Sequence, residues 1–174
     1  CDSIGEDNEE MQQNEPLKVT KEVWSNLKAL GGFSPKIDPE DLVFVGVRDT
    51  EKEEEHLMSK YNIRNYTVQE TKELGMKVVV DQINEKLTNC DLIYVSFDVD
   101  SMDPDVVSYG TGTPVKNGLH PDQCRELISE LLQSEKLCCF ELVEVNPLLD
   151  NKGNVMAEVA LEILETAVKT IEKR

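Results

Sequence analysis

An apolar run that leads directly into acids, VSFDVDSMDP at residues 95–104, constrains the fold more than any other stretch of the sequence. Together with the residues before it, the run forms the strongest strand-like segment in the chain, DLIYVSFDV at residues 91–99. Segments rich in β-branched and aromatic residues are typical of buried strands. Asp98 and Asp100 stand at the carboxyl end of this segment. In open α/β sheets, ligands bind at that end of the strands.

Strand-like runs alternate with helical patterns along the rest of the chain. The further strands are expected at 41–47, 62–68 and 136–145, and helices at 19–30, 51–61, 69–88 with a break near Gly75, 121–133 and 154–172. The alternation predicts an α/β fold with a mainly parallel sheet. We expect the strand at 41–47 to be covered on both faces, the helix at 154–172 to bury one wide apolar stripe, and Cys138 and Cys139 to be buried.

The length of 174 residues fits one domain of ordinary size. Residues 1–16 are acidic and polar, and we expect them to form a solvated loop or a disordered end, with residues 17–174 forming the domain. The five cysteines have no metal-ligand spacing, and their odd number argues against a disulfide framework. The cysteine content therefore favours a reducing cytoplasm.

Charge narrows the range of partners. The chain has 35 acidic and 18 basic side chains, which gives a net charge of −17. A surface of this charge repels phosphate backbones and anionic lipid, so we expect neither nucleic acid nor a membrane as a partner. No apolar run approaches the roughly 20 residues that a membrane-spanning helix requires.

The pair of aspartates suggests a cation site. Carboxylates two residues apart on a strand point to the same face, about 6 to 7 Å apart. They remain ionised together only when a cation or a set of donors compensates their charge, and Mg²⁺, Mn²⁺ and Ca²⁺ prefer such oxygen ligands. Two other interpretations of the pair stay open. Asp98 and Asp100 can simply cap a turn, or they can belong to a Mg²⁺ phosphohydrolase, although such enzymes usually have a threonine where Ser101 and Met102 stand.

A glycine-rich loop and a second acid-tipped strand follow the aspartates. The loop YGTGTPVKNG at residues 109–118 has the composition of a backbone that passes close to a ligand. No helix follows it directly, which excludes a phosphate-binding loop or a dinucleotide fingerprint. The last expected strand ends on Glu144, within the stretch ELVEVNPLLDNKGN.

Taken together, SFDVDSMDP, GTGTPV and ELVEVNPLLDNKGN resemble the ureohydrolases, the arginase and agmatinase family, over roughly residues 40–174. The resemblance implies a three-layer α/β/α fold. The family's G-G-D-H and D-A-H-x-D motifs, which supply four further metal ligands, do not occur, so we expect the chain to be the carboxyl-terminal half of that fold. The EVNP stretch is more similar to arginases than to agmatinases, and formiminoglutamases usually have a different loop in place of GTGTP.

The same resemblance implies roles for four residues. Asp98 would bridge two Mn²⁺ ions, Asp100 would bind one of them, Glu144 would receive the substrate's guanidinium group, and Thr113 would lie beside it. In such a site two metal ions lower the pKa of a shared water and stabilise the tetrahedral intermediate, while a carboxylate holds the planar cation by a charge-assisted contact. His56 and His120 match no family ligand, and we expect them to be exposed or to cap helices.

The function expected from the resemblance is that of a Mn²⁺-dependent arginase, which hydrolyses L-arginine to L-ornithine and urea. Its substrate would be a small guanidino compound, and it would work in the cytoplasm as a trimer or hexamer. Agmatinase or another ureohydrolase activity is one alternative. A second is a non-catalytic chain that keeps the fold for subunit contacts.

Overall fold

The computed structural model describes residues 18–174, and the acidic end expected at residues 1–16 lies outside the described part. The chain divides into two compact units. The first contains helices α2 (Lys18–Ala29) and α3 (Lys52–Lys60). The second, residues 44–49 and 65–174, carries every residue that the sequence predicts for the site.

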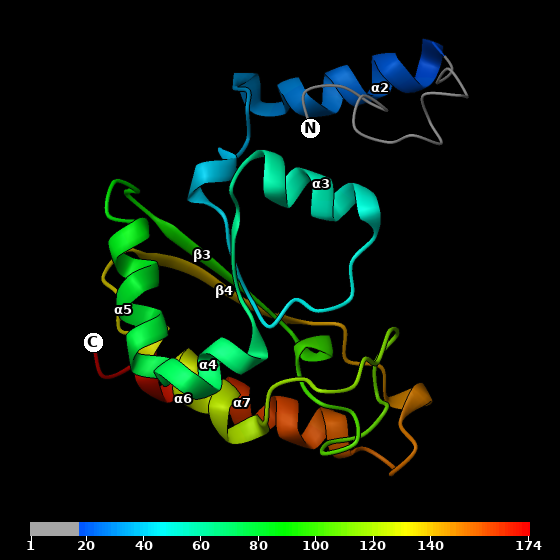
Figure 1. The fold of residues 1–174 in the computed structure, drawn as a ribbon, viewed down its shortest axis with the longest axis vertical. Coiled ribbons are helices and arrows are strands. Elements are labelled where there is room, and N and C mark those ends of the chain that lie inside the picture. Colours follow the sequence, from blue (N-terminus) through cyan, green and yellow to red (C-terminus); the bar gives the residue numbers. More distant parts are fainter. Residues whose placement is uncertain (1–17) are drawn as a thin grey trace. The chain divides into compact units, whose positions relative to one another are not determined.

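All of the helices and strands predicted from the sequence occur (Figure 1). In addition to α2 and α3 they are β1 (Val43–Val45), β2 (Arg64–Tyr66), α4 (Val68–Leu74), α5 (Met76–Lys86), β3 (Ile93–Asp98), α6 (Pro121–Leu131), β4 (Leu137–Val143) and α7 (Val155–Ile171). The predicted break lies at Gly75, whose φ of 82° separates α4 from α5. Glycine adopts this left-handed conformation without the steric cost that a Cβ would bring.

The second unit is built on the parallel pair β3 and β4, in which Phe97 is opposite Leu142 and Asp98 opposite Val143. Helix α6 lies in the connection between these strands and packs against both α5 and α7. Figure 1 shows these three helices on the same side of the pair. Their apolar faces form the core with the inward side chains of β3, among them Phe97 at 5% exposure. The predicted α/β class with parallel strands is confirmed.

The opposite face of β3 is open within this unit. Exposed and buried residues alternate along β3, with Tyr94 56% exposed. The predicted burial of Cys138 and Cys139 is wrong, because both are exposed. The register shifts between Ile93 and Tyr94, which pair with Leu137 and Cys139, so Cys138 is the extra residue of a β-bulge.

Two other burial predictions are only partly correct. The inward stripe of α7 is narrower than expected: its fully buried members are Met156, Ala160, Ile163 and Ala167. Leu164 and Val168, which we expected in the stripe, are 42% and 46% exposed. The residues of β1 are half-buried rather than covered on both faces.

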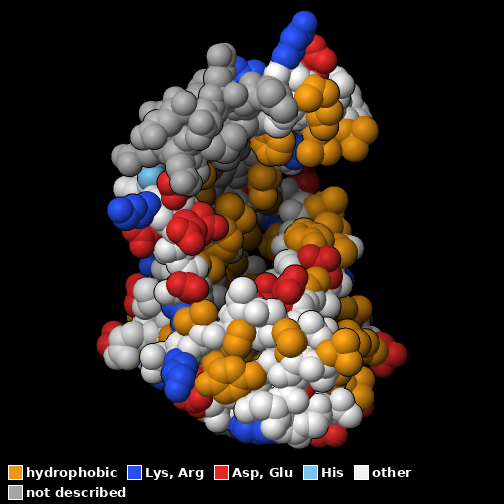
Figure 2. Space-filling view, turned by 90° about the vertical axis from the view of Figure 1, so that its right-hand side faces the viewer, with side chains coloured by type: hydrophobic (Ala, Val, Ile, Leu, Met, Phe, Trp, Pro, Cys, Tyr) orange, Lys and Arg blue, Asp and Glu red, His pale blue; other side chains and the backbone are white. Residues whose placement is uncertain are grey.

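Acidic side chains are spread over the face of the molecule that Figure 2 shows, rather than gathered in one patch. This distribution fits charge that solvates the surface. Between residues 18 and 174, no helix is both long enough and apolar enough to cross a membrane.

Candidate active site

The register of the parallel pair brings the first two site residues together. Asp98 is the last residue of β3 and is opposite Val143, the last residue of β4. Glu144 follows Val143 directly, so both acids lie at the carboxyl edge of the pair. The predicted strand end is correct for Asp98, whereas Glu144 lies one residue beyond the end of its strand.

Asp100 reaches the same edge by a different route from the one predicted. The strand ends at Asp98, and residues Val99–Ser101 form a 3-10 turn, so the two-residue strand spacing does not apply. Instead, the backbone N–H of Asp100 donates to Oδ1 of Asp98 at 2.8 Å. Asp98 therefore caps the turn that carries Asp100. The capping role that the sequence left open as an alternative is real, and it coexists with the clustering of the two acids.

Two threonines of the glycine-rich loop hold the Asp100 carboxylate. Thr113 donates its hydroxyl to Oδ2 of Asp100. Thr111 donates to Oδ1 of Asp100, and the same hydroxyl oxygen lies 2.9 Å from the backbone carbonyl oxygen of Glu144. Thr111 is only 2% exposed. The position of Thr113 beside Glu144, which the resemblance implies, stays a prediction. The Thr111 hydroxyl lies between Asp100 and Glu144.

Glu144 has an unusual backbone, with a φ of 66°. A non-glycine residue in the left-handed region carries strain that the surrounding structure must hold, and such residues cluster at functional sites. Gly112 lies beside its side chain, since a Cβ at Gly112 would stand 3.8 Å from Oε2 of Glu144. The loop thus borders the Glu144 carboxylate as well as Asp100.

The electrostatics at this edge disfavour the ionised form of Asp98. Burial, together with the nearby charges of Asp100 and Glu144, raises the pKa of Asp98 above its usual value, although the N–H of Asp100 acts in the opposite direction. A raised carboxyl pKa means that the folded chain disfavours the ionised form. A cation at this edge would relieve that cost.

The donor chemistry fits a hard divalent ion, because carboxylate oxygens are its preferred ligands. The number of side chains that could bind the ion is small, however. Across residues 18–174, no group of three or more His, Cys, Asp and Glu side chains is arranged to hold a metal ion. Asp98 and Asp100 would therefore supply part of a coordination shell and not all of it.

The three sequence motifs meet at one place. The N–H of Asn146 donates to the carbonyl oxygen of Gly110 at 2.8 Å, and the Ser108 hydroxyl donates to Oδ2 of Asp150 at 2.8 Å. The N–H of Tyr109 donates to Oδ1 of Asn151. The start of the glycine-rich loop is therefore bonded along the segment that follows Glu144.

Gly110 has no room for a side chain at this junction. A Cβ there would lie 2.5 Å from Cβ of Met156 and 2.8 Å from Oδ2 of Asp150. We expect Gly110→Ala to lower the free energy of unfolding by about 2 kcal/mol, because overpacking forces the neighbours apart. Urea denaturation measures the change. Gly112→Ala is the matched control, since its Cβ would meet only ordinary contact, and equal losses in the two variants would contradict the steric account.

Asp150 joins the loop to the last helix. Its Oδ2 accepts from the Met156 N–H as well as from Ser108, and its Oδ1 accepts from the Lys152 N–H. Desolvation alone would raise the pKa of Asp150, but the hydrogen bonds from Met156, Lys152 and Ser108 outweigh it and lower the pKa. The stabilising form is the carboxylate.

The pH dependence of this contribution follows from the direction of the shift. A carboxyl group whose pKa is lowered by folding adds stability above its unfolded pKa, about 3.9, and loses it as pH falls through the folded value. Asp150→Asn should therefore unfold at a lower temperature than wild type at neutral pH, with the difference shrinking in acid. Asp91→Asn, at an exposed position before β3, is the control. A difference in unfolding temperature that is independent of pH would contradict the assignment.

The two histidines are exposed or cap a helix, as predicted. His120 is the N-cap of α6, where its ring accepts from the Asp122 N–H. His56 is exposed on α3.

Parallel strands whose carboxyl ends carry an acid cluster, bordered by a Gly-Thr loop, define an α/β protein with an acidic site. Comparison with known proteins gives its family. The model of the arginase family matches residues 29–169, and the chain belongs to that family. It is 33% identical to the arginase of Bacillus subtilis (strain 168) over 152 residues, which are 87% of this chain and 51% of the relative. It is 36% identical to the arginase of Staphylococcus aureus (strain COL), covering 80% of this chain and 49% of the relative.

Solved structures agree. The arginase of Helicobacter pylori superposes with a TM-score of 0.82 at 32% identity, covering 90% of this chain and 53% of that one. The proclavaminate amidino hydrolase of Streptomyces clavuligerus superposes with a TM-score of 0.66 at 31% identity, covering 78% of this chain and 43% of that one. The chain therefore has the arginase fold and spans about half the length of the curated relatives it matches.

Proposed function

We propose that this chain carries part of the active site of a Mn²⁺-dependent arginase, which hydrolyses L-arginine to L-ornithine and urea. One observation carries the proposal: Asp98, Asp100 and Glu144 come together at the carboxyl edge of β3 and β4. Membership of the arginase family and the identity to relatives named arginase support it. A cytoplasmic location and assembly into a trimer or hexamer belong to the same proposal.

Each side chain has a task in this reaction. Asp98 and Asp100 would hold Mn²⁺, and bound ions would make hydroxide available near neutral pH. Glu144 would bind the substrate's guanidinium by a charge-assisted, paired contact. The Thr111 hydroxyl lies between the carboxylate of Asp100 and the backbone carbonyl of Glu144 and can donate its proton to either. The negative charge of the cluster attracts a cationic substrate before contact.

Urea release tests the proposal directly. The protein as its gene encodes it should release urea from L-arginine when Mn²⁺ is supplied, and should lose the activity when a chelator removes the metal. Agmatine and other guanidino compounds, assayed in parallel, identify the substrate. Faster turnover of agmatine would replace the arginine assignment with another ureohydrolase activity. The superposition on a hydrolase whose name indicates a different amidino substrate is the reason to include such compounds.

A non-catalytic role is the second candidate, and a specific observation favours it. No set of three metal-ligating side chains is assembled by the residues that the structure describes. Failure of the encoded protein to bind Mn²⁺ or to release urea from any guanidino compound, while it still assembles with itself, would establish this role.

A further inference from the structure

One arginine, Arg48, is hydrogen-bonded to the backbone of the segments that form the acidic site. Arg48 follows β1 and is half-buried within the same compact unit as the site. Its guanidinium group donates only to backbone carbonyl oxygens: Nε to Lys116, Nη1 to Gly46 and Ser101, and Nη2 to Asp100, Met102 and Val115. With six acceptors for five N–H groups, every donor of the side chain is used.

The acceptors belong to the two segments that build the site. Asp100, Ser101 and Met102 form the turn after β3, and Val115 and Lys116 end the glycine-rich loop. Other bonds also join these segments: the Leu119 N–H donates to Ser101 at 2.9 Å, the Asp103 N–H donates to Leu119 at 3.0 Å, and the Asn117 N–H donates to Oδ2 of Asp103 at 3.1 Å. The Thr111 and Thr113 hydroxyls donate to the Asp100 carboxylate. Arg48 therefore connects the turn that carries Asp100 to the loop that carries Thr113.

We propose that Arg48 is a positioning residue, which holds the turn of Asp100 against the loop of Thr113 before any metal binds. The expected effect of Arg48 on Mn²⁺ binding rests on the proposed function. The expected effect of Arg48 on the turn and the loop does not. The Asp100 carboxylate accepts from Thr111 and Thr113 only while turn and loop stay together. Loss of Arg48 would therefore release the Asp100 carboxylate as well as the backbone.

The positive charge of Arg48 alone does not explain how it holds the turn and the loop together. The planar fork of arginine reaches acceptors on opposite sides at once, whereas the lysine ammonium offers three donors from a single point. Arg48→Lys keeps the charge that balances Asp100, Asp103 and Asp49 but can satisfy at most half of the carbonyl groups. Arg48→Met keeps much of the volume and loses every donor.

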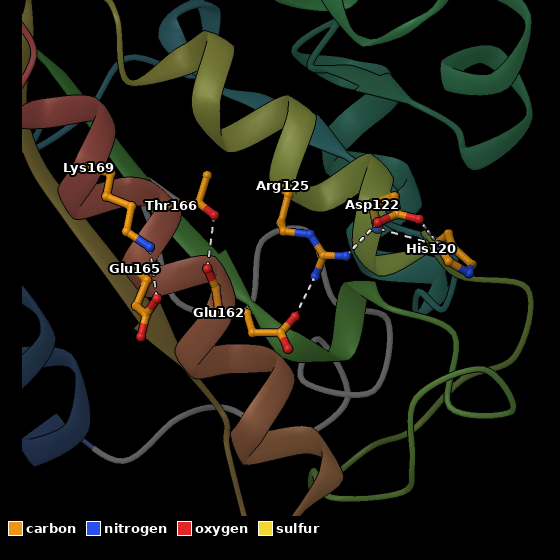
Figure 3. Close-up of polar contacts among 7 residues, drawn as sticks. All are labelled: His120, Asp122, Arg125, Glu162, Glu165, Thr166 and Lys169. Carbon is orange, nitrogen blue, oxygen red and sulfur yellow. Dashed lines mark hydrogen bonds and ion pairs between the residues drawn. The ribbon is translucent and has the colours of Figure 1, made fainter.

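Hydrogen exchange of the backbone amides tests the proposal without metal. We expect Arg48→Met to speed exchange at Asp103 and Leu119 by about tenfold or more, since hydrogen bonds to a charged group contribute at least that factor. Arg48→Lys should fall between Arg48→Met and wild type, and the amides of α7 should not change. Arg125 gives matched controls, because it makes only side-chain pairs, with Asp122 and Glu162 (Figure 3). Arg125→Met should leave Asp103 and Leu119 unchanged.

Mn²⁺ titration of the same variants then separates the two proposals. Tenfold or weaker binding in Arg48→Met, with a smaller loss in Arg48→Lys, supports the positioning role. Exchange at Asp103 and Leu119 equal to wild type, or acceleration spread uniformly over α5, α6 and α7, would overturn it. If wild type binds no Mn²⁺, the proposed function fails, and the exchange rates alone decide the role of Arg48.

Discussion

Glu144→Gln is expected to lower kcat/KM for L-arginine by at least about a hundredfold while Mn²⁺ binding stays unchanged. Glutamine keeps the shape of the side chain but removes the charge that would pair with the guanidinium group. A hundredfold loss corresponds to about 2.7 kcal/mol, within the range for removing one partner of a desolvated ion pair. Steady-state urea release and a Mn²⁺ titration measure the two effects separately.

The conformation of Glu144 makes this substitution well suited to the test. Its backbone φ is 66°, and its carbonyl oxygen lies 2.9 Å from the Thr111 hydroxyl oxygen, a contact that glutamine leaves in place. Glu135→Gln, at an exposed position, is the matched control and should have no effect. Loss of Mn²⁺ together with activity would show that Glu144 binds metal rather than substrate.

Asp98→Asn is expected to stabilise the metal-free protein and to abolish its stabilisation by Mn²⁺. Folding raises the pKa of Asp98, through burial and through the charges of Asp100 and Glu144. An acid with a raised folded pKa loses stability as pH rises from the unfolded value, about 3.9, through the folded one. At neutral pH the ionised Asp98 opposes folding, so the asparagine variant should unfold at a higher temperature. In acid the difference should disappear.

In the presence of Mn²⁺, wild type should unfold at a higher temperature than Asp98→Asn. A ligand present at about a hundred times its Kd stabilises the protein that binds it by about 2.7 kcal/mol, and only wild type should gain this. Asparagine can still accept the N–H of Asp100 through Oδ1, so the turn itself is kept. Asp91→Asn, at an exposed position before β3, is the control for loss of one charge. An Asp98→Asn variant that Mn²⁺ stabilises as much as wild type would remove Asp98 from the metal site.

The helices and strands of this fold were predictable because the spacing of apolar residues differs between helices and strands. Continuous apolar runs gave β3 and β4, and the break at Gly75 needed only the conformational freedom of glycine. Burial was harder, because it depends on which neighbours pack. Cys138 is the extra residue of a one-residue shift in pairing, and Leu164 lies outside the buried stripe of α7.

The acidic residues of the site were predictable from the sequence. The residues that hydrogen-bond to them were less predictable. Asp98 and Glu144 stand where two strands end, and this is visible in the sequence. Thr111 and Thr113 alternate with glycines in one loop, and no sequence signal separates the buried link from its neighbour. Arg48 had a weak signal, as a single basic residue directly after a strand in an acidic chain. Its role became clear only from the carbonyl groups that surround it.

The parallel pairing of β3 and β4 also has a consequence for the rate of folding. Two parallel strands cannot be joined by a tight turn, and here the connection includes the loop and all of α6. Contacts between such distant segments form slowly, because a long loop must close before they contribute. We therefore expect Asp98 and Glu144 to come together only after this long connection has closed.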